Sequence, residues 1–315
     1  MSLDGGGIKG LFSAAIMTHI ENDLNTRISD HFDLIVGTST GGIIALGLAI
    51  GMTPKEIVHF YVKNGPKIFP PSIFAEKRHL FKMKYNSDTL ELAIRECFGD
   101  KIMSDCFKRL VVPSYNISED DIYLFKTPHH KRLTRDWKIP LWKVAMATSA
   151  APTYFPSFQK LDHIRLIDGG VWSNNPTMVG IVEAISMLNV PLSSIKVCNL
   201  GTTDEIKGRP KKLDEGGLWQ WKNDAVEVIM RGQSIGAYTQ ALHLIGKGNI
   251  LRINPPVPKG LFELDKLSEH ELLAKASHIS RQCAPAFKTM FTNHIASKFE
   301  PFYKNNGANN HEPRG

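Results

Sequence analysis

The sequence has no run of about 18 consecutive apolar residues, so we expect no transmembrane helix. Its four cysteines show no C-x-x-C or Cys/His ligand spacing, which argues against a structural zinc and favours a reduced, cytoplasmic chain. The beginning of the chain lacks the order of a signal peptide, because glycines and Lys9 interrupt any apolar core. We therefore expect a globular protein that needs no metal or cofactor.

The composition is ordinary for such a protein. The chain has 315 residues, enough for one large α/β domain or two small ones, with 42% hydrophobic and 22% charged residues. A net charge of +7 favours anionic surfaces, which include phospholipid membranes and nucleic acids. Charge alone does not distinguish these partners from a surface that only contacts solvent.

Alternating helix and strand patterns without a repeat predict one α/β layer fold. Apolar residues recur every four positions from Ile16 to Ile28, which indicates a helix that begins near Gly10. Further helices are expected over residues 43–50, from Thr53, from Asp88 to Gly99, over residues 179–188 and 219–245, and from Ser268; strands are expected near residues 34–37, 110–112, 122–125, 166–168 and 195–200.

We expect a single domain over residues 1–304. Its motif-bearing core covers residues 1–180, and the remaining strands and C-terminal helices cover residues 181–304. The last residues, 305–315, are polar and contain glycine, so we expect a disordered tail there.

The run GTSTG at residues 37–41 is a G-x-S-x-G motif between a short apolar strand and an expected helix. Gly37 and Gly41 leave room for the sharp bend that would expose the Ser39 hydroxyl as a nucleophile. The motif lies too early for the α/β-hydrolase order, in which several strands precede the serine and a histidine follows it. On its own such a motif is more often an ordinary turn.

The glycines near the start of the chain allow two interpretations. Gly5, Gly7 and Gly10 match G-x-G-x-x-G, but a dinucleotide site needs an acidic residue at the end of the second strand, and Asp33 precedes that strand. Beside a serine nucleophile, the same turn can present backbone N–H groups to an oxyanion. We therefore expect Gly5, Gly6 and Gly7 to form an oxyanion hole.

None of the twelve histidines carries a catalytic signature. His129 and His130 lie in a basic stretch that indicates a solvated loop. Others fall on expected helices, where a surface or core role is more common than catalysis: His243, His270, His278 and His294.

Asp168 is a better candidate for the base that a serine nucleophile requires. It ends an apolar strand and precedes the turn Gly169-Gly170. A carboxylate in such a partly desolvated turn can have a raised pKa and accept the serine proton directly. Taken alone, however, Asp-Gly-Gly is more often a turn than a catalytic site.

Four motifs in order resemble the patatin-like phospholipase family: DGGGIKG at residues 4–10, GTSTGG at 37–42, ATSAAPTYF at 147–155 and DGG at 168–170. The similarity covers about residues 1–180. It implies a three-layer α/β/α fold with a mostly parallel central sheet, and a serine–aspartate dyad without histidine that acts on acyl esters of membrane lipids. By motif match, Ser39 would be the nucleophile, Asp168 the base, and Gly5, Gly6 and Gly7 the oxyanion hole.

The resemblance also implies partners. We expect a membrane phospholipid or another acyl lipid as substrate, with peripheral contact at the membrane surface and no nucleic acid polymer. The rival is a catalytically silent or resting lipid-binding protein of the same fold. Some bacterial relatives are antiviral effectors switched on by cyclic nucleotides, but no motif here identifies a nucleotide site.

The stretch at residues 63–85 mixes cations with aromatic and aliphatic side chains. Such a composition is typical of a mobile cap that contacts acyl chains and lipid headgroups, with Phe74 and Phe81 as candidate contacts. A loop packed on the core, with its lysines in solvent, is the alternative.

Overall fold

The computed structural model describes residues 1–70, 84–205, 211–217, 221, 224–257 and 269–304. Most of the stretch predicted to contact lipid, including Phe74 and Phe81, lies outside the described residues. The predicted disordered tail at residues 305–315 lies outside them as well.

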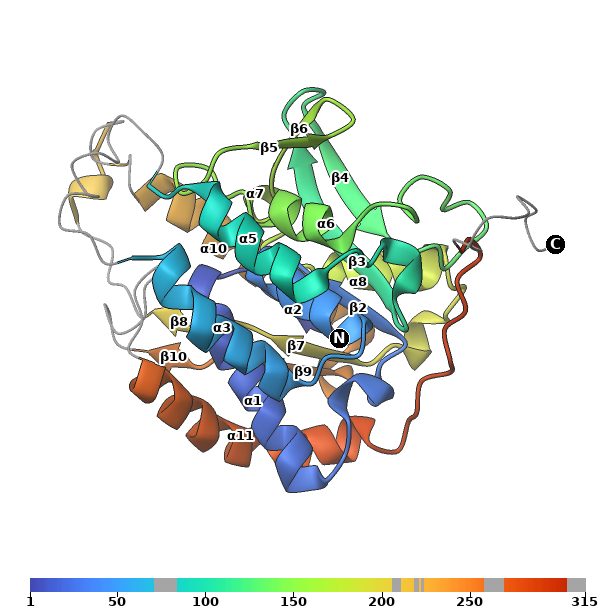
Figure 1. Cartoon of the computed structure of the whole chain (residues 1–315). Helices are drawn as coiled ribbons and strands as arrows, with labels where there is room; N and C mark the ends of the chain where they lie inside the picture. The colour runs from blue at the N-terminus through green and yellow to red at the C-terminus, as the bar shows by residue number, and fades with distance from the viewer. Residues whose placement is uncertain (71–83, 206–210, 218–220, 222–223, 258–268, 305–315) are drawn as a thin grey trace.

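An eight-stranded sheet runs through the described part of the chain (Figure 1). In spatial order its strands are β5 (Phe158–Leu161), β6 (Ile164–Asp168), β3 (Arg109–Asn116), β2 (Leu34–Gly37), β1 (Ser2–Leu3), β7 (Val197–Leu200) and β9 (Ile250–Ile253), while β4 (Asp121–Lys126) pairs with β3. The short strands β8 (Asp204–Glu205) and β10 (Pro256–Val257) form a separate pair.

The strand directions divide the sheet into two parts. From β3 through β2, β1 and β7 to β9 all pairs are parallel, as predicted. On the other side β3 pairs antiparallel with β4 and β6, and β5 pairs antiparallel with β6. The sheet is therefore mixed, with a parallel part that runs from β3 to the edge strand β9 and an antiparallel part on the other side that the sequence pattern did not predict.

Helices cover both faces of this sheet (Figure 1). The described α-helices are α1 (Gly10–Leu24), α2 (Thr40–Ala49), α3 (Pro54–Ile68), α5 (Ser87–Phe98), α6 (Leu141–Thr148), α7 (Gly170–Ser173), α8 (Thr177–Ser186), α10 (Asp224–Ile245) and α11 (Glu269–Phe291). The described 3-10 helices are η1 (Gly7–Lys9), η2 (Ile28–His31), η3 (Met103–Asp105), η4 (Leu192–Ser194), η5 (Lys211–Leu213) and η6 (Lys247–Asn249).

Two hydrophobic clusters separate the layers. Side chains of a strand point alternately to opposite faces, and along β7 Val197 joins one cluster whereas Cys198 joins the other. The larger cluster contains the buried faces of α1, α2 and α11, and the smaller one lies under α8 and α10. The predicted α/β/α layering is confirmed.

Local signals account for the helix ends. Thr53 caps α3 through a capping box with Glu56, as predicted, and Gly99 ends α5 with a positive φ of 54°. The cap of α5 is Asn86, whose side chain accepts the Asp88 amide, so this helix begins slightly earlier than expected.

His129 corrects one sequence-based prediction, because it is buried and does not lie in a solvated loop. Its Nε2 lies 2.9 Å from the Glu183 carboxylate, and its Nδ1 lies 2.9 Å from the Thr127 hydroxyl. Glu183 is itself buried on α8 and also contacts Lys126, and a buried carboxylate requires such partners. His294 differs too, since it lies beyond the end of α11 and contacts Asp33.

No helix in the described ranges combines the length and apolar character needed to cross a bilayer.

Candidate active site

Two of the sequence motifs meet where neighbouring parallel strands end. β1 pairs with β2 with Leu3 opposite Gly37, and the Thr38 amide donates to the Leu3 carbonyl at 3.1 Å. The glycine turn after β1 therefore lies beside the serine turn after β2. A Cβ built on Gly5 would lie 3.4 Å from the Ser39 Cβ, so the two turns are in contact.

Ser39 occupies a sharp strand-to-helix turn. Its backbone has φ 56° and ψ −123°, a conformation that costs a non-glycine residue about 1–3 kcal/mol. A Cβ on Gly37 would lie 2.1 Å from the Gly41 carbonyl oxygen, and a Cβ on Gly41 would lie 2.3 Å from the Leu3 carbonyl oxygen. The two motif glycines therefore stand where no side chain fits, and the turn leaves the Ser39 side chain partly exposed.

Asp168 reaches this turn through the antiparallel edge of the sheet. β2 pairs with β3 as far as Val111, but β3 continues to Asn116, and β6 returns along that extension with Asp168 opposite Ser114. β6 thus ends just beyond the carboxyl end of β2. A Cβ on Gly169 would lie 2.3 Å from the Pro113 carbonyl oxygen, so this turn packs directly against β3.

The Ser39 hydroxyl lies beside the Asp168 carboxylate and acts to lower the pKa of that carboxyl group. A second oxygen contact of Asp168 comes from the Gly170 amide, which donates at 2.7 Å. Asp168 is only 5% exposed, and its burial raises the pKa of its carboxyl group to about 6, whereas the Ser39 hydroxyl and the Gly170 amide act in the opposite direction. A carboxylate with this pKa is ionised at neutral pH and can accept a proton.

The amides of the glycine turn differ in their partners. The Gly5 amide donates to the Asn174 carbonyl at 2.9 Å, so it is already engaged. Within the described residues the Gly6 and Gly7 amides have no hydrogen-bond partner. Gly7 has φ 59° and opens η1, so these amides lie at a helix start, where N–H groups favour an anion.

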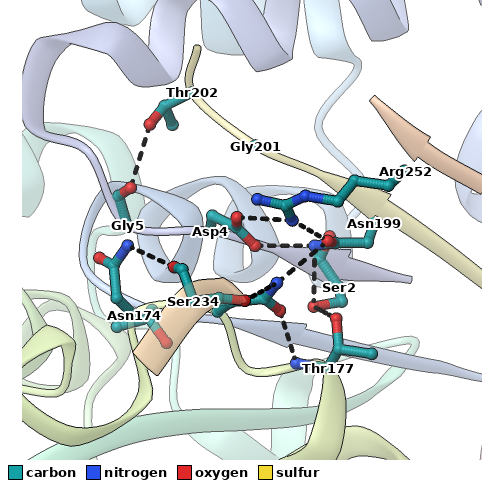
Figure 2. A network of polar contacts seen from close by, with 12 residues as sticks. Ser2, Asp4, Gly5, Asn174, Thr177, Asn199, Gly201, Thr202, Ser234 and Arg252 are labelled. Carbon is teal, nitrogen blue, oxygen red and sulfur yellow. Dashed lines mark hydrogen bonds and ion pairs between the residues drawn. The ribbon is translucent and has the colours of Figure 1, made fainter. Parts of the chain in front are cut away.

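A buried polar network holds the glycine turn (Figure 2). Asp4 is 4% exposed, and its carboxylate accepts the Asn199 side-chain amide at 2.7 Å and pairs with Arg252 at 3.0 Å. Arg252 also donates to the Asn199 side chain. Burial raises the pKa of Asp4, and Arg252 and Asn199 oppose that shift. Arg252 thus supplies the countercharge for a carboxylate next to Gly5.

The same network reaches the segment after the Asp-Gly-Gly turn. Asn174 accepts the Gly5 amide through its carbonyl, and its side chain donates to Ser234 on α10 at 3.1 Å (Figure 2). The Asn175 side chain donates to Asn199 at 3.2 Å. The segments after β1 and β6 are therefore joined to each other, to β7 and to α10.

Sequence reasoning proposed Ser39 and Asp168 as site residues, but it did not find the residues that hold the surrounding turns in place. Asn174 and Asn175 follow the short helix α7 after the Asp-Gly-Gly turn, and Arg252 interrupts the apolar strand β9, so each had a local signal. In the described residues the partners of the Asp168 carboxylate are Ser39 and Gly170, neither of them a histidine. No cluster of three metal-binding side chains occurs there either.

A family model described as patatin-like phospholipase matches residues 1–181. The chain is 37% identical over 220 residues to a cGAMP-activated phospholipase from Escherichia coli (strain TW11681), which covers 65% of this chain and 62% of that protein. It is 30% identical over 280 residues to a protein of the same name from Pseudomonas aeruginosa (strain BWHPSA011 / Pa011), which covers 85% and 82%.

The match to the Escherichia coli protein spans less than two thirds of that protein's length. A plant protein is also similar: Patatin-like protein 4 from Arabidopsis thaliana is 32% identical over 207 residues, which covers 58% of this chain and 50% of that protein.

Replacing Arg252 with methionine leaves the Asp4 carboxylate buried without its cation. Removing one partner of a buried pair costs about 3–5 kcal/mol, so we expect the free energy of unfolding of Arg252→Met to fall by that amount in urea titrations. The double variant Asp4→Asn/Arg252→Met should recover part of the loss, because no charge is then left unpaired. Simple addition of the two single-variant costs would contradict the coupling.

Proposed function

Because the chain belongs to the patatin-like phospholipase family, we propose that it is a lipid acyl hydrolase that cleaves fatty-acyl esters of membrane glycerolipids. The observation that carries the proposal is the position of Ser39, on a strained turn, beside the buried Asp168, whose pKa it acts to lower. Both residues lie inside the matched range, residues 1–181. Gly6 and Gly7 complete the proposed site as donors to the oxyanion.

In the first step Asp168 accepts the hydroxyl proton of Ser39 while the Ser39 oxygen attacks the ester carbonyl carbon. The carbonyl π electrons move to oxygen, and the Gly6 and Gly7 amides stabilise that oxyanion. When the intermediate collapses, the bond to the lipid alcohol breaks, and the leaving oxygen takes the proton from Asp168. Ser39 is left as a fatty-acyl ester.

In the second step water replaces the alcohol. Asp168 accepts a proton from water as the water oxygen attacks the acyl carbonyl, again with the oxyanion at the glycine amides. Collapse breaks the bond to Ser39, whose oxygen takes the proton back from Asp168. The fatty acid is released and both residues return to their starting states.

Peripheral contact with a membrane is part of this proposal. Val171 follows Gly170 directly and is exposed, and α10, which packs against α7, exposes Ile229 and Ile235. Apolar side chains beside the site, together with a net charge of +7, favour an anionic lipid surface.

A cyclic nucleotide is proposed as an activator on the strength of the relatives named cGAMP-activated phospholipases. The protein would then be a resting enzyme until the activator binds. This second proposal concerns regulation and leaves the chemistry of Ser39 and Asp168 unchanged.

The dyad is tested by fatty-acid release from mixed phospholipid vesicles. Ser39→Ala should abolish release, and Asp168→Asn should lower the rate by about 10²–10⁴-fold, the usual contribution of a general base. Ser186→Ala and Asp23→Asn, both on exposed parts of helices, serve as matched controls. Full activity in Asp168→Asn would contradict the dyad.

The pH dependence follows from the raised pKa of Asp168. The base works only when deprotonated, so kcat/KM on a short soluble ester should fall below about pH 6 and approach a tenfold loss per pH unit. Asp168→Asn should lack this limb in its residual activity. A wild-type profile that stays flat down to pH 4.5 would exclude Asp168 as the base.

Activation is tested by adding cGAMP to the wild type during vesicle hydrolysis. We expect the rate to rise at saturating cGAMP and Ser39→Ala to stay inactive with or without it. An unchanged wild-type rate, with a fluorophosphonate probe labelling Ser39 equally fast in both conditions, would contradict the activator proposal.

A further inference from the structure

The Ser39 turn has a partner outside the motif that contains it. The Ser39 amide donates to the Thr148 hydroxyl oxygen at 2.9 Å, across 109 positions of sequence. Ser39 precedes the first residue of α2, so this amide lies outside the hydrogen-bond ladder of the helix. The bond therefore fixes the backbone nitrogen of Ser39, a residue with a positive φ.

The Thr148 side chain is held on three sides. Its hydroxyl donates to the Pro113 carbonyl on β3 at 2.6 Å, so its proton points away from Ser39 and a lone pair faces the Ser39 amide. Its methyl group packs over α2, because a Cβ built on Gly42 would lie 2.8 Å from that methyl. The residue is completely buried at the end of α6. Few orientations are open to it.

The segment after Thr148 also holds Asp168. The Asp168 amide donates to the Ala150 carbonyl at 3.0 Å, two residues beyond Thr148. The amides of Ser39 and Asp168 are thus bonded to the same short segment, residues 148–150. Ser39 bonds the Thr148 side chain, and Asp168 bonds the Ala150 main chain. Both residues are also connected to β3. Ser39 is connected through Thr148, whose hydroxyl bonds Pro113, and Asp168 is connected directly, because it pairs with Ser114.

We propose that Thr148 is a positioning residue, whose hydroxyl sets the place of Ser39 relative to Asp168. The proposal rests on the function proposed for the dyad. Thr148 would act through Ser39 alone, since its hydroxyl is already used by the Ser39 amide and the Pro113 carbonyl. A role in packing alone is the competing explanation, and it depends on the methyl group.

Two substitutions separate the hydroxyl from the methyl. Thr148→Val keeps the shape and removes the hydroxyl, and Thr148→Ser keeps the hydroxyl and removes the methyl. With a short soluble ester, Thr148→Val should lower kcat about 10–100-fold with little change in KM, because a misplaced nucleophile slows the chemical step. Thr148→Ser should restore most of kcat. Thr18→Val on α1 is a matched control away from the site.

A second readout is the acid limb of the pH profile. The Ser39 hydroxyl acts to lower the pKa of Asp168, so displacing Ser39 should move the acid limb of Thr148→Val to higher pH. Thermal melting checks that the variants are folded. If the protein shows no turnover without an activator, the rate at which a fluorophosphonate labels Ser39 is measured in place of kcat. This labelling rate should fall in Thr148→Val.

Two results would overturn the proposal. One is wild-type kcat and labelling rate in Thr148→Val; the other is an equal loss in Thr148→Val and Thr148→Ser with an unmoved acid limb, which would assign the effect to packing. Ser39→Ala and Asp168→Asn in the same assay distinguish this failure from that of the proposed function. If both dyad variants remain active, the dyad itself is wrong.

Discussion

The strained backbone of Ser39 is the constraint on which the candidate site depends. A positive φ at a residue with a side chain persists only where its surroundings hold it there. Here the surroundings are the adjacent strand β1, the close packing of Gly41 on the Leu3 carbonyl, and the Thr148 hydroxyl. Two of these contacts come from β1 and the third from the end of α6, so the turn requires tertiary structure.

Two buried carboxylates near this turn have different environments. Asp4 has Arg252 and Asn199 as partners, so its charge is compensated and it anchors the glycine turn. Asp168 has a hydroxyl and an amide as partners, and burial leaves its pKa raised to about 6. The first arrangement suits a structural ion pair, and the second suits a group that accepts and returns a proton.

Much of the fold could be predicted because its signals are local. The capping box at Thr53, the glycine that ends α5 and the apolar run of α2 each follow from neighbouring residues. The antiparallel edge and the burial of His129 could not be predicted in this way. β6 pairs with an extension of β3 some 50 residues away, and His129 contacts Glu183 on the helix α8, 54 positions along the chain.

The sequence by itself determined the family, the α/β layers, and the candidate nucleophile and base, because ordered motifs and hydrophobic periodicity are written along the chain. Only the tertiary structure decided that β6 ends beside Ser39 and that Thr148 and Arg252 support the site. It also decided that, among the residues the structure describes, the Gly5 amide has a partner whereas the Gly6 and Gly7 amides have none. These features depend on contacts between residues that are far apart in sequence. They follow from strand order and register, which no local pattern specifies.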